Sequence, residues 1–295
     1  MTDHTPQQGA ASGGAATTAA PAPAAQQVTD ASAGENEREE KIRALLERFA
    51  TDDNVKELQR LLLVPTGVPE TLRPAVWRYF LGSGARSAAE ASPLAAQTSP
   101  VLPGELAKLR SDCAACALVG DERSLMRGRE REARERLERV VLCFRTRSGV
   151  REYGRWMCTV VAPFVCLGLS ETECMACALE FARCVAPQVL CSDARFASTA
   201  LSELVRLLVY YFDPPLGFHL DQRGLSAADW VPELLATLLA SVCADLGAVH
   251  VLWDAVFVSH DARMATALVL VLLVRSSSLL RAAGTADALK EALAS

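Results

Sequence analysis

The feature that most constrains this chain is a helical spacing of apolar residues, which recurs from residue 42 almost to the carboxyl end. Apolar side chains return every three or four positions, which places them on one face of an α-helix. Ile42, Leu45 and Phe49 begin the series, and Leu201 and Val205 belong to a later part of it. The sequence has no useful alternating apolar and polar run and no Asn-Gly or Asp-Gly hairpin signal. It therefore predicts an all-α fold of many short, packed helices.

Two low-complexity stretches bound and interrupt this helical part. Residues 1–37 are rich in Ala, Gly, Pro and Gln and have no aromatic side chain. Such a segment buries too little apolar surface to offset the entropy of ordering. Residues 83–104 are rich in Ser, Gly, Ala and Pro, which is typical of a flexible loop. We expect a disordered tail over 1–37 and a single helical domain over 38–294, with a flexible loop at 83–104.

Charge and apolar runs exclude several functional classes. The formal net charge is −5, which disfavours a general nucleic-acid binder. The longest uncharged apolar run, residues 156–170, contains Pro163 and is too short to span a bilayer. No Lys or Arg precedes Arg38, so the amino-terminal part lacks the pattern of a secretory or mitochondrial leader. We expect a cytoplasmic protein that reaches membranes only through its partners.

Cysteine supplies the clearest candidate for metal binding. The pairs Cys113/Cys116 and Cys174/Cys177 have the C-x-x-C spacing of zinc ligands. However, 57 residues separate the two pairs, whereas zinc ribbons place them about 15–20 residues apart. Cys174, Cys177 and Cys184 also fall on an apolar helical face, as small buried hydrophobic residues do. We interpret the cysteines as reduced core thiols and expect no metal and no cofactor.

Residues 121–155 form a basic stretch, with eleven Arg and seven Asp or Glu. This stretch could form a docking face for an acidic partner or anionic lipid. It also fits a solvated helix, because Glu130/Arg134 is one of several i,i+4 ion pairs in the favourable order. The two interpretations are compatible. The chain has no H-E-x-x-H, G-x-S-x-G or phosphate-loop motif, so no self-contained hydrolase or nucleotide site is visible.

Residues 67–82 read G-V-P-E-T-L-R-P-A-V-W-R-Y-F-L-G. This segment resembles the opening motif of the TBC domain, the Rab GTPase-activating fold, which reads G-[IV]-P-x-x-L-R-x-x-x-W. Arg73 and Trp77 occupy the Arg and Trp positions, and their i,i+4 spacing would let the guanidinium lie against the indole. Residues 249–257, V-H-V-L-W-D-A-V-F, are similar to a second motif of the family. The resemblance covers about residues 64–282 and implies a Rab-type small GTPase as partner.

Active members of the family resemble each other in two finger motifs, I-x-x-D-x-x-R and Y-x-Q-G-M. The resemblance implies that the Arg stabilises charge on the transferred phosphoryl group and that the Gln positions the attacking water. Here Tyr153 matches the second motif, but Arg155 replaces its Gln. Asp121 matches the first motif, but Arg123 falls one residue early and Ser124 stands at the Arg position. A guanidinium only donates hydrogen bonds, so Arg155 cannot accept one from water as an amide can.

Both departures predict a TBC-domain protein that binds a small GTPase or a multi-subunit signalling complex, with weak or no activation of GTP hydrolysis. In this respect the chain resembles members of the family that lack the fingers and dock a coiled-coil helix. Arg73, Trp77, Asp121 and Tyr153 are then GTPase-binding or motif positions. The alternative is an active Rab GTPase-activating protein that uses Arg123 or Arg155 as its arginine finger. Either way, we expect a regulator of GTPases in vesicle trafficking rather than a stand-alone enzyme.

Overall fold

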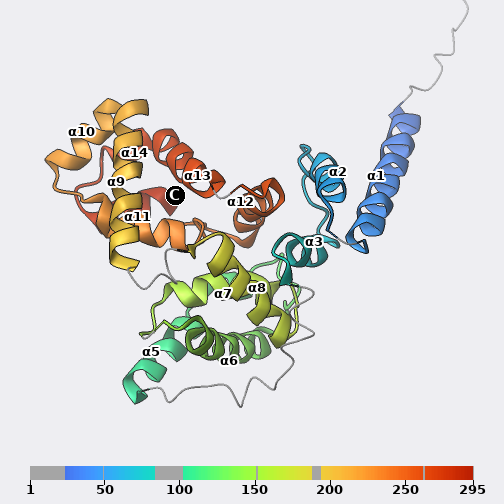
Figure 1. Cartoon of the computed structure of the whole chain (residues 1–295), viewed down its shortest axis with the longest axis horizontal. Coiled ribbons are helices and arrows are strands. Elements are labelled where there is room, and N and C mark those ends of the chain that lie inside the picture. Colours follow the sequence, from blue (N-terminus) through green and yellow to red (C-terminus); the bar gives the residue numbers. More distant parts are fainter. Residues whose placement is uncertain are drawn as a thin grey trace, which may run out of the picture. The chain divides into compact units, whose positions relative to one another are not determined.

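A computed structural model of the chain describes residues 24–48, 50–83, 102–150, 152–187, 194–261 and 263–294. Within these ranges the regular structure is helical and no strand occurs, which confirms the predicted all-α fold (Figure 1). The longer helices are α1 (Ala24–Leu46), α2 (Asp52–Leu62), α3 (Arg73–Phe80), α5 (Pro103–Ala114), α6 (Glu130–Ser148), α7 (Trp156–Cys166), α8 (Glu171–Cys184), α9 (Ala194–Phe212), α10 (Pro214–Gln222), α11 (Ala227–Ala236), α12 (Leu246–Ser259), α13 (Arg263–Arg275) and α15 (Ala286–Ala294). Two short elements, the 3₁₀ turn η2 (Ala117–Gly120) and α14 (Ser277–Leu280), complete the order.

The chain divides into two compact units, Met1–Lys41 and Ile42–Ser295. The sequence predicts a disordered tail over 1–37, but α1 begins at Ala24 and is helical through the rest of that segment. Its second half is rich in Glu, Lys and Arg, which favour helix, and Glu37 forms an i,i+4 ion pair with Lys41 at 2.7 Å. The remainder of the predicted tail, and the predicted loop between residues 84 and 101, lie outside the described residues.

Local capping residues set where several helices begin and end. The Ser170 side chain accepts a hydrogen bond from the Glu173 N–H, and the Glu173 carboxylate accepts one from the Ser170 N–H. This reciprocal capping box satisfies two backbone donors at the start of α8. Helix α6 ends at Ser148 and is capped by Gly149, whose φ of 74° lies in the left-handed region that glycine adopts at little cost.

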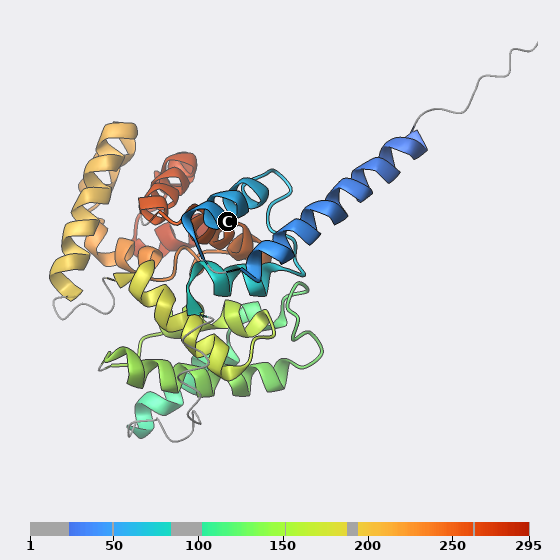
Figure 2. The same cartoon turned by 45° about the vertical axis from the view of Figure 1, so that its right-hand side comes forward.

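Two apolar clusters form the core of the second unit. The first is built largely from α3, α6, α7, α8 and α12, and the second from α9, α10, α11, α13 and α15. Helices α6, α7 and α8 pack on one another (Figures 1 and 2). Leu252 of α12 and Leu268 of α13 pack against both clusters, so these two helices join the halves of the core.

Candidate functional site

The opening motif is attached to α12 through one buried carboxylate. The Arg73 Nε atom lies 3.1 Å from Asp254 Oδ2, and Trp77 Nε1 donates to Asp254 Oδ1 at 2.6 Å. Arg73 Nη2 also donates to the carbonyl oxygen of Val68, at 3.1 Å. Arg73 and Trp77 therefore meet at Asp254, and this shared acceptor replaces the stacking that their i,i+4 spacing predicts.

Aromatic rings enclose Trp77 on several sides. Its ring centroid lies 5.2–5.7 Å from those of four neighbours, namely Phe164, His250, Trp253 and Phe257. Trp77, Phe164 and Trp253 are completely buried, as we expect for core aromatics, and Arg73 is only 7% exposed. Arg73 and Trp77 thus hold α3 against α12 and leave very little of their own surface exposed.

Burial also sets the protonation of the ionisable groups on this part of α12. It raises the pKa of the Asp254 carboxyl above its ordinary value, and the Arg73 charge and the Trp77 N–H oppose this rise. It lowers the pKa of His250 to about 3, with a further contribution from the positive charge of Arg73. His250 is therefore a neutral core residue, and its Nε2 atom has no hydrogen-bond partner among the described residues.

The segment at the first finger motif lies between η2 and α6 and is tied to the amino-terminal end of α12. The two carboxylate oxygens of Asp121 accept hydrogen bonds from the backbone N–H groups of Arg123, at 2.8 Å, and Leu246, at 2.9 Å. Ser124, at the position of the family's finger arginine, is only 4% exposed, and its hydroxyl accepts a hydrogen bond from the Met126 N–H. Asp121 and Ser124 are therefore positioning residues of this loop.

The Arg123 guanidinium rests on the first turn of α12. Its Nη1 atom lies 3.6 Å from Asp245 Oδ1, and a Cβ atom added to Gly247 would come within 1.2 Å of it. Asp245 is also the N-cap of α12, where its side chain accepts a hydrogen bond from the Ala248 N–H. Arg123 remains about half exposed. The glycine leaves the space that the guanidinium occupies.

Tyr153, in the second finger motif, is anchored to α5. Its hydroxyl donates to Asp112 Oδ2 at 2.8 Å and lies 3.1 Å from Cys158 Sγ, while its backbone N–H donates to Glu105 Oε1 at 2.6 Å. Glu105 also forms a largely buried, two-point ion pair with Arg145. Burial raises the pKa of the Tyr153 hydroxyl well above its ordinary value. Tyr153 thus fixes the segment that leads into α7.

The two candidate finger arginines lie at opposite ends of α7. Arg155 directly precedes the helix and is exposed, with no ion pair among the described residues. The loop of Arg123 is attached to the other end, because the Leu125 N–H donates to the carbonyl oxygen of Cys166. At 1.5 Å per residue, an 11-residue helix such as α7 is about 16 Å long. The structure brings both candidates to the same helix and leaves their side chains separate.

The two C-x-x-C pairs, Cys113/Cys116 and Cys174/Cys177, do not come together as a four-thiolate site. Cys113 Sγ lies 3.3 Å from Cys158 Sγ, and Cys177 Sγ lies 3.3 Å from the Ser83 hydroxyl. Most of the described cysteines are buried, but Cys184 is exposed because it ends α8, so its expected place in the core is wrong. In the described part of the chain, no group of three His, Cys, Asp or Glu side chains is placed to hold a metal ion. Nor does that part contain a helix long and apolar enough to cross a membrane.

These features define an all-helical domain whose amino-terminal L-R-x-x-x-W segment is locked to a W-D helix. The family model of the Rab-GTPase-TBC domain matches residues 70–280, more than two thirds of the chain. The chain therefore belongs to the RabGAP-TBC family. Family membership places the protein among regulators of Rab-type small GTPases.

Comparisons with individual proteins support the fold. Among solved structures, the chain is similar to the crystal structure of the Chlamydomonas flagellar RabGAP TBC domain, with a TM-score of 0.60 and 17% sequence identity. The match covers 92% of this chain and 85% of that chain. No curated protein sequence matches the chain.

Three residues of this region escape prediction from sequence, for different reasons. Asp254 is visible in the W-D pair, but its bonds to the opening motif depend on a contact across 181 positions. Asp245 has the residue type of an N-cap, which is a recognisable signal. Gly247 matters because of the side chain that it lacks, and no sequence pattern predicts that Arg123 fills the space.

Proposed function

We propose that this protein binds a Rab-type small GTPase, or a complex that contains one, and accelerates GTP hydrolysis weakly or not at all. The observation that carries the proposal is at the first finger. Ser124 stands at the arginine position and is buried, while the neighbouring Arg123 rests on α12 beside Asp245. This arrangement supports weak catalysis, because Arg123 would have to leave Asp245 before it could act as a finger.

The magnitude of the missing contribution supports weak catalysis. An arginine finger supplies about 10³–10⁵-fold in rate to a GTPase, because its charge stabilises the transferred phosphoryl group. Arg123 would first have to leave Asp245 and Gly247. Arg155, at the glutamine position, carries a suitable charge but no acceptor to orient the attacking water. The first finger motif therefore lacks an arginine at its usual position, and the second lacks the amide that would orient the attacking water.

A second candidate function is an active GTPase-activating protein that uses Arg155 or Arg123. Arg155 favours it, because this guanidinium is exposed and forms no ion pair with the described residues. Little free energy is needed to free Arg123 from Asp245, since an exposed ion pair of this kind contributes only about 0–1 kcal/mol. In this second candidate function the protein also binds a GTPase, but Arg155 or Arg123 acts as the arginine finger.

The test is single-turnover GTP hydrolysis by a panel of Rab-type GTPases, with and without the protein, alongside a direct binding assay. We expect binding to at least one GTPase and less than about tenfold stimulation, unchanged by Arg123→Ala or Arg155→Ala. Arg281→Ala, at an exposed position outside the finger segments, is the matched control for loss of a positive charge. Stimulation of about a hundredfold or more, abolished by one finger variant and kept by the control, would establish the active enzyme.

Restoring the family pattern gives a complementary measurement. Arg155→Gln alone should leave hydrolysis slow, because the phosphoryl charge still lacks a finger. Adding Ser124→Arg should be needed for acceleration, although burial of Ser124 means that the loop has to move to admit the longer side chain. Acceleration by Arg155→Gln alone would show that Arg123 already reaches the nucleotide.

The remaining expectations follow from the same proposal. A regulator of Rab-type GTPases would act in vesicle trafficking from the cytoplasm and reach membranes through its partner. The degenerate fingers also resemble the small TBC subunit of the tuberous sclerosis complex, which docks a coiled-coil helix. In one form of this proposal, the protein is a non-catalytic subunit of a larger assembly and contacts the GTPase through its partner subunits.

A further inference from the structure

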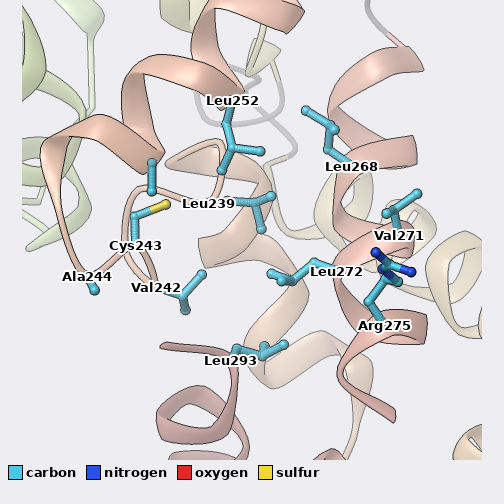
Figure 3. Close-up of a pocket in the computed structure, with 11 residues that line it drawn as sticks. Leu239, Val242, Cys243, Ala244, Leu252, Leu268, Val271, Leu272, Arg275 and Leu293 are labelled. Atoms are coloured by element: carbon cyan, nitrogen blue, oxygen red, sulfur yellow. The ribbon is translucent and has the colours of Figure 1, made fainter. Parts of the chain in front are cut away.

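A cavity of about 330 Å³ lies between α12, α13, α15 and the loop that follows α11 (Figure 3). Its size is at the lower end of the range for small-molecule sites, about 300–1,000 Å³. Each wall contributes apolar side chains, which are Leu239, Val242, Cys243, Ala244, Ala248, Leu252, Leu268, Val271, Leu272 and Leu293. The cavity is remote in sequence from both finger motifs.

One charged side chain belongs to the lining. Arg275 ends α13 at the edge of the cavity, next to Val271 (Figure 3). Arg275 is exposed and forms no ion pair within the described residues, and no acidic side chain occurs among the residues that line the cavity. A positive charge at the edge of an apolar space selects ligands that carry an anionic group on an apolar body.

The wall formed by the loop after α11 is held in an unusual backbone conformation. Leu238 and Leu239 have φ values of 47° and 66°, in the left-handed region that leucine rarely adopts. The Leu238 carbonyl oxygen accepts a hydrogen bond from Trp253 Nε1 at 3.1 Å, which ties the loop to the core. Strained backbone persists where the surroundings over-determine it, and it occurs frequently at ligand sites.

Helix α13 leaves further apolar surface uncovered beside the cavity. No charged residue occurs between Arg263 and Arg275, and only Ala265, Val269 and Leu273 of this helix are buried. Val271, on the edge of the cavity, is 56% exposed. Val271 therefore adds apolar surface at the open edge of the cavity.

We propose that this cavity binds a free, single-chain carboxylate of medium length, with its hydrocarbon tail among the leucines and its carboxylate on Arg275. The proposal does not depend on the proposed function. A monomeric ligand is favoured over a bilayer, because binding to anionic membranes uses clusters of several basic residues. Here a single guanidinium stands beside an apolar cavity that is partly open to solvent.

Isothermal titration calorimetry of the full chain with octanoate, decanoate and dodecanoate, below micelle formation, tests the proposal. Each added CH₂ that enters the cavity should tighten the Kd about fourfold, the equivalent of the usual burial term. Decanol, which has the same tail without the charge, should bind more weakly than decanoate. Binding without dependence on chain length would overturn the proposal.

Substitutions separate the roles of charge and cavity. Arg275→Gln should weaken decanoate at least tenfold and leave decanol unchanged, while Arg281→Gln, at an exposed position outside the lining, should alter neither. Ala248→Trp should fill the cavity and abolish binding of both. Because a large residue could disturb the packing there, Val271→Trp at the exposed edge serves as a second filling variant, with circular dichroism to check the fold.

Three further results would overturn this assignment. The first is the absence of saturable decanoate binding, which would leave the α13 surface to a protein partner. The second is equal decanoate affinity in the wild type and Arg275→Gln. The third is retention on phosphatidylcholine vesicles that contain no free fatty acid, unaffected by Ala248→Trp, which would identify a membrane-binding surface instead.

Discussion

Asp254 accepts hydrogen bonds from Arg73 and Trp77, which lie 181 and 177 positions away in the sequence. Asp254→Asn should destabilise the fold by about 3–5 kcal/mol, because it leaves the buried Arg73 cation without a counter-charge. The double replacement Arg73→Met/Asp254→Leu should cost less than Asp254→Asn, since it removes both charges from the core. The measurement is the free energy of unfolding in urea.

The matched control is an exposed ion pair in the same protein. Arg60 and Glu57 lie 3.2 Å apart on α2 and are largely solvent-exposed. Glu57→Gln should change the free energy of unfolding by less than about 0.5 kcal/mol. Comparable losses for Asp254→Asn and Glu57→Gln would contradict the structural role of the buried carboxylate.

His250 links the same core to pH. Its pKa is lowered to about 3 in the folded chain, from an ordinary value of 6.5. Between these values the unfolded chain binds the proton and the folded chain does not, so stability falls as the pH drops below 6.5. Wild type should therefore lose about 2 kcal/mol more than His250→Phe when urea unfolding is compared at pH 7 and pH 5. Equal losses would place the responsible group elsewhere.

Among the helices, α12 connects the two parts of the candidate site. Its first turn holds the Asp121 and Arg123 loop, and two turns further on Asp254 holds the opening motif. The position of the loop therefore depends on how α12 begins. We expect a substitution in the first turn of α12 to change the position of Arg123 more than it changes the packing of the core.

Two glycines of the chain allow a test of whether the Arg123 contact contributes to the stability of the core. In Gly247→Ala the atoms nearest to the new Cβ belong to the flexible end of Arg123 and, at 3.0 Å, to the Asp245 carboxylate, so stability should stay within about 1 kcal/mol of wild type. In Gly217→Ala, the Cβ would lie 2.9 Å from Tyr210 Cγ, at the base of a ring, and the net loss should be about 1–2 kcal/mol. Urea unfolding of both variants checks the order. A larger loss for Gly247→Ala would show that the Arg123 contact is part of the core.

Sequence reasoning succeeds for these elements where the cause is local. Apolar spacing predicts the helices, and the two family motifs predict the fold, whereas the packing of α3 against α12 is seen only in the structure. The stacking of Arg73 on Trp77 is predicted from local spacing and is not observed, because a buried guanidinium requires a counter-charge and Asp254 provides it. The position of the Arg123 guanidinium could not be predicted, because it occupies the space that the missing side chain of Gly247 leaves.

For the whole molecule, the sequence places the main folding domain at 38–294, and this boundary remains a prediction. Among residues 34–48 whose side chains the structure describes, Ile42 is the first that is buried. Removing residues 1–37 should therefore change the free energy of unfolding by less than about 1 kcal/mol. Thermal melting of residues 38–295 against the full chain measures it. A loss of several kcal/mol would show that the amino-terminal segment is part of the folding unit.

The ion pair between Arg73 and Asp254 also determines when the core can form during synthesis of the chain. The cation is translated 181 residues before the carboxylate that neutralises it. At about 5–20 residues per second, the wait is roughly 10–40 s. During this interval Trp77 of α3 lacks the three ring neighbours that α12 supplies, His250, Trp253 and Phe257, and its surface is open to aggregation or to a chaperone. The bond that locks the finished domain is thus also the reason that the nascent chain cannot close its core until nearly all of it has been made.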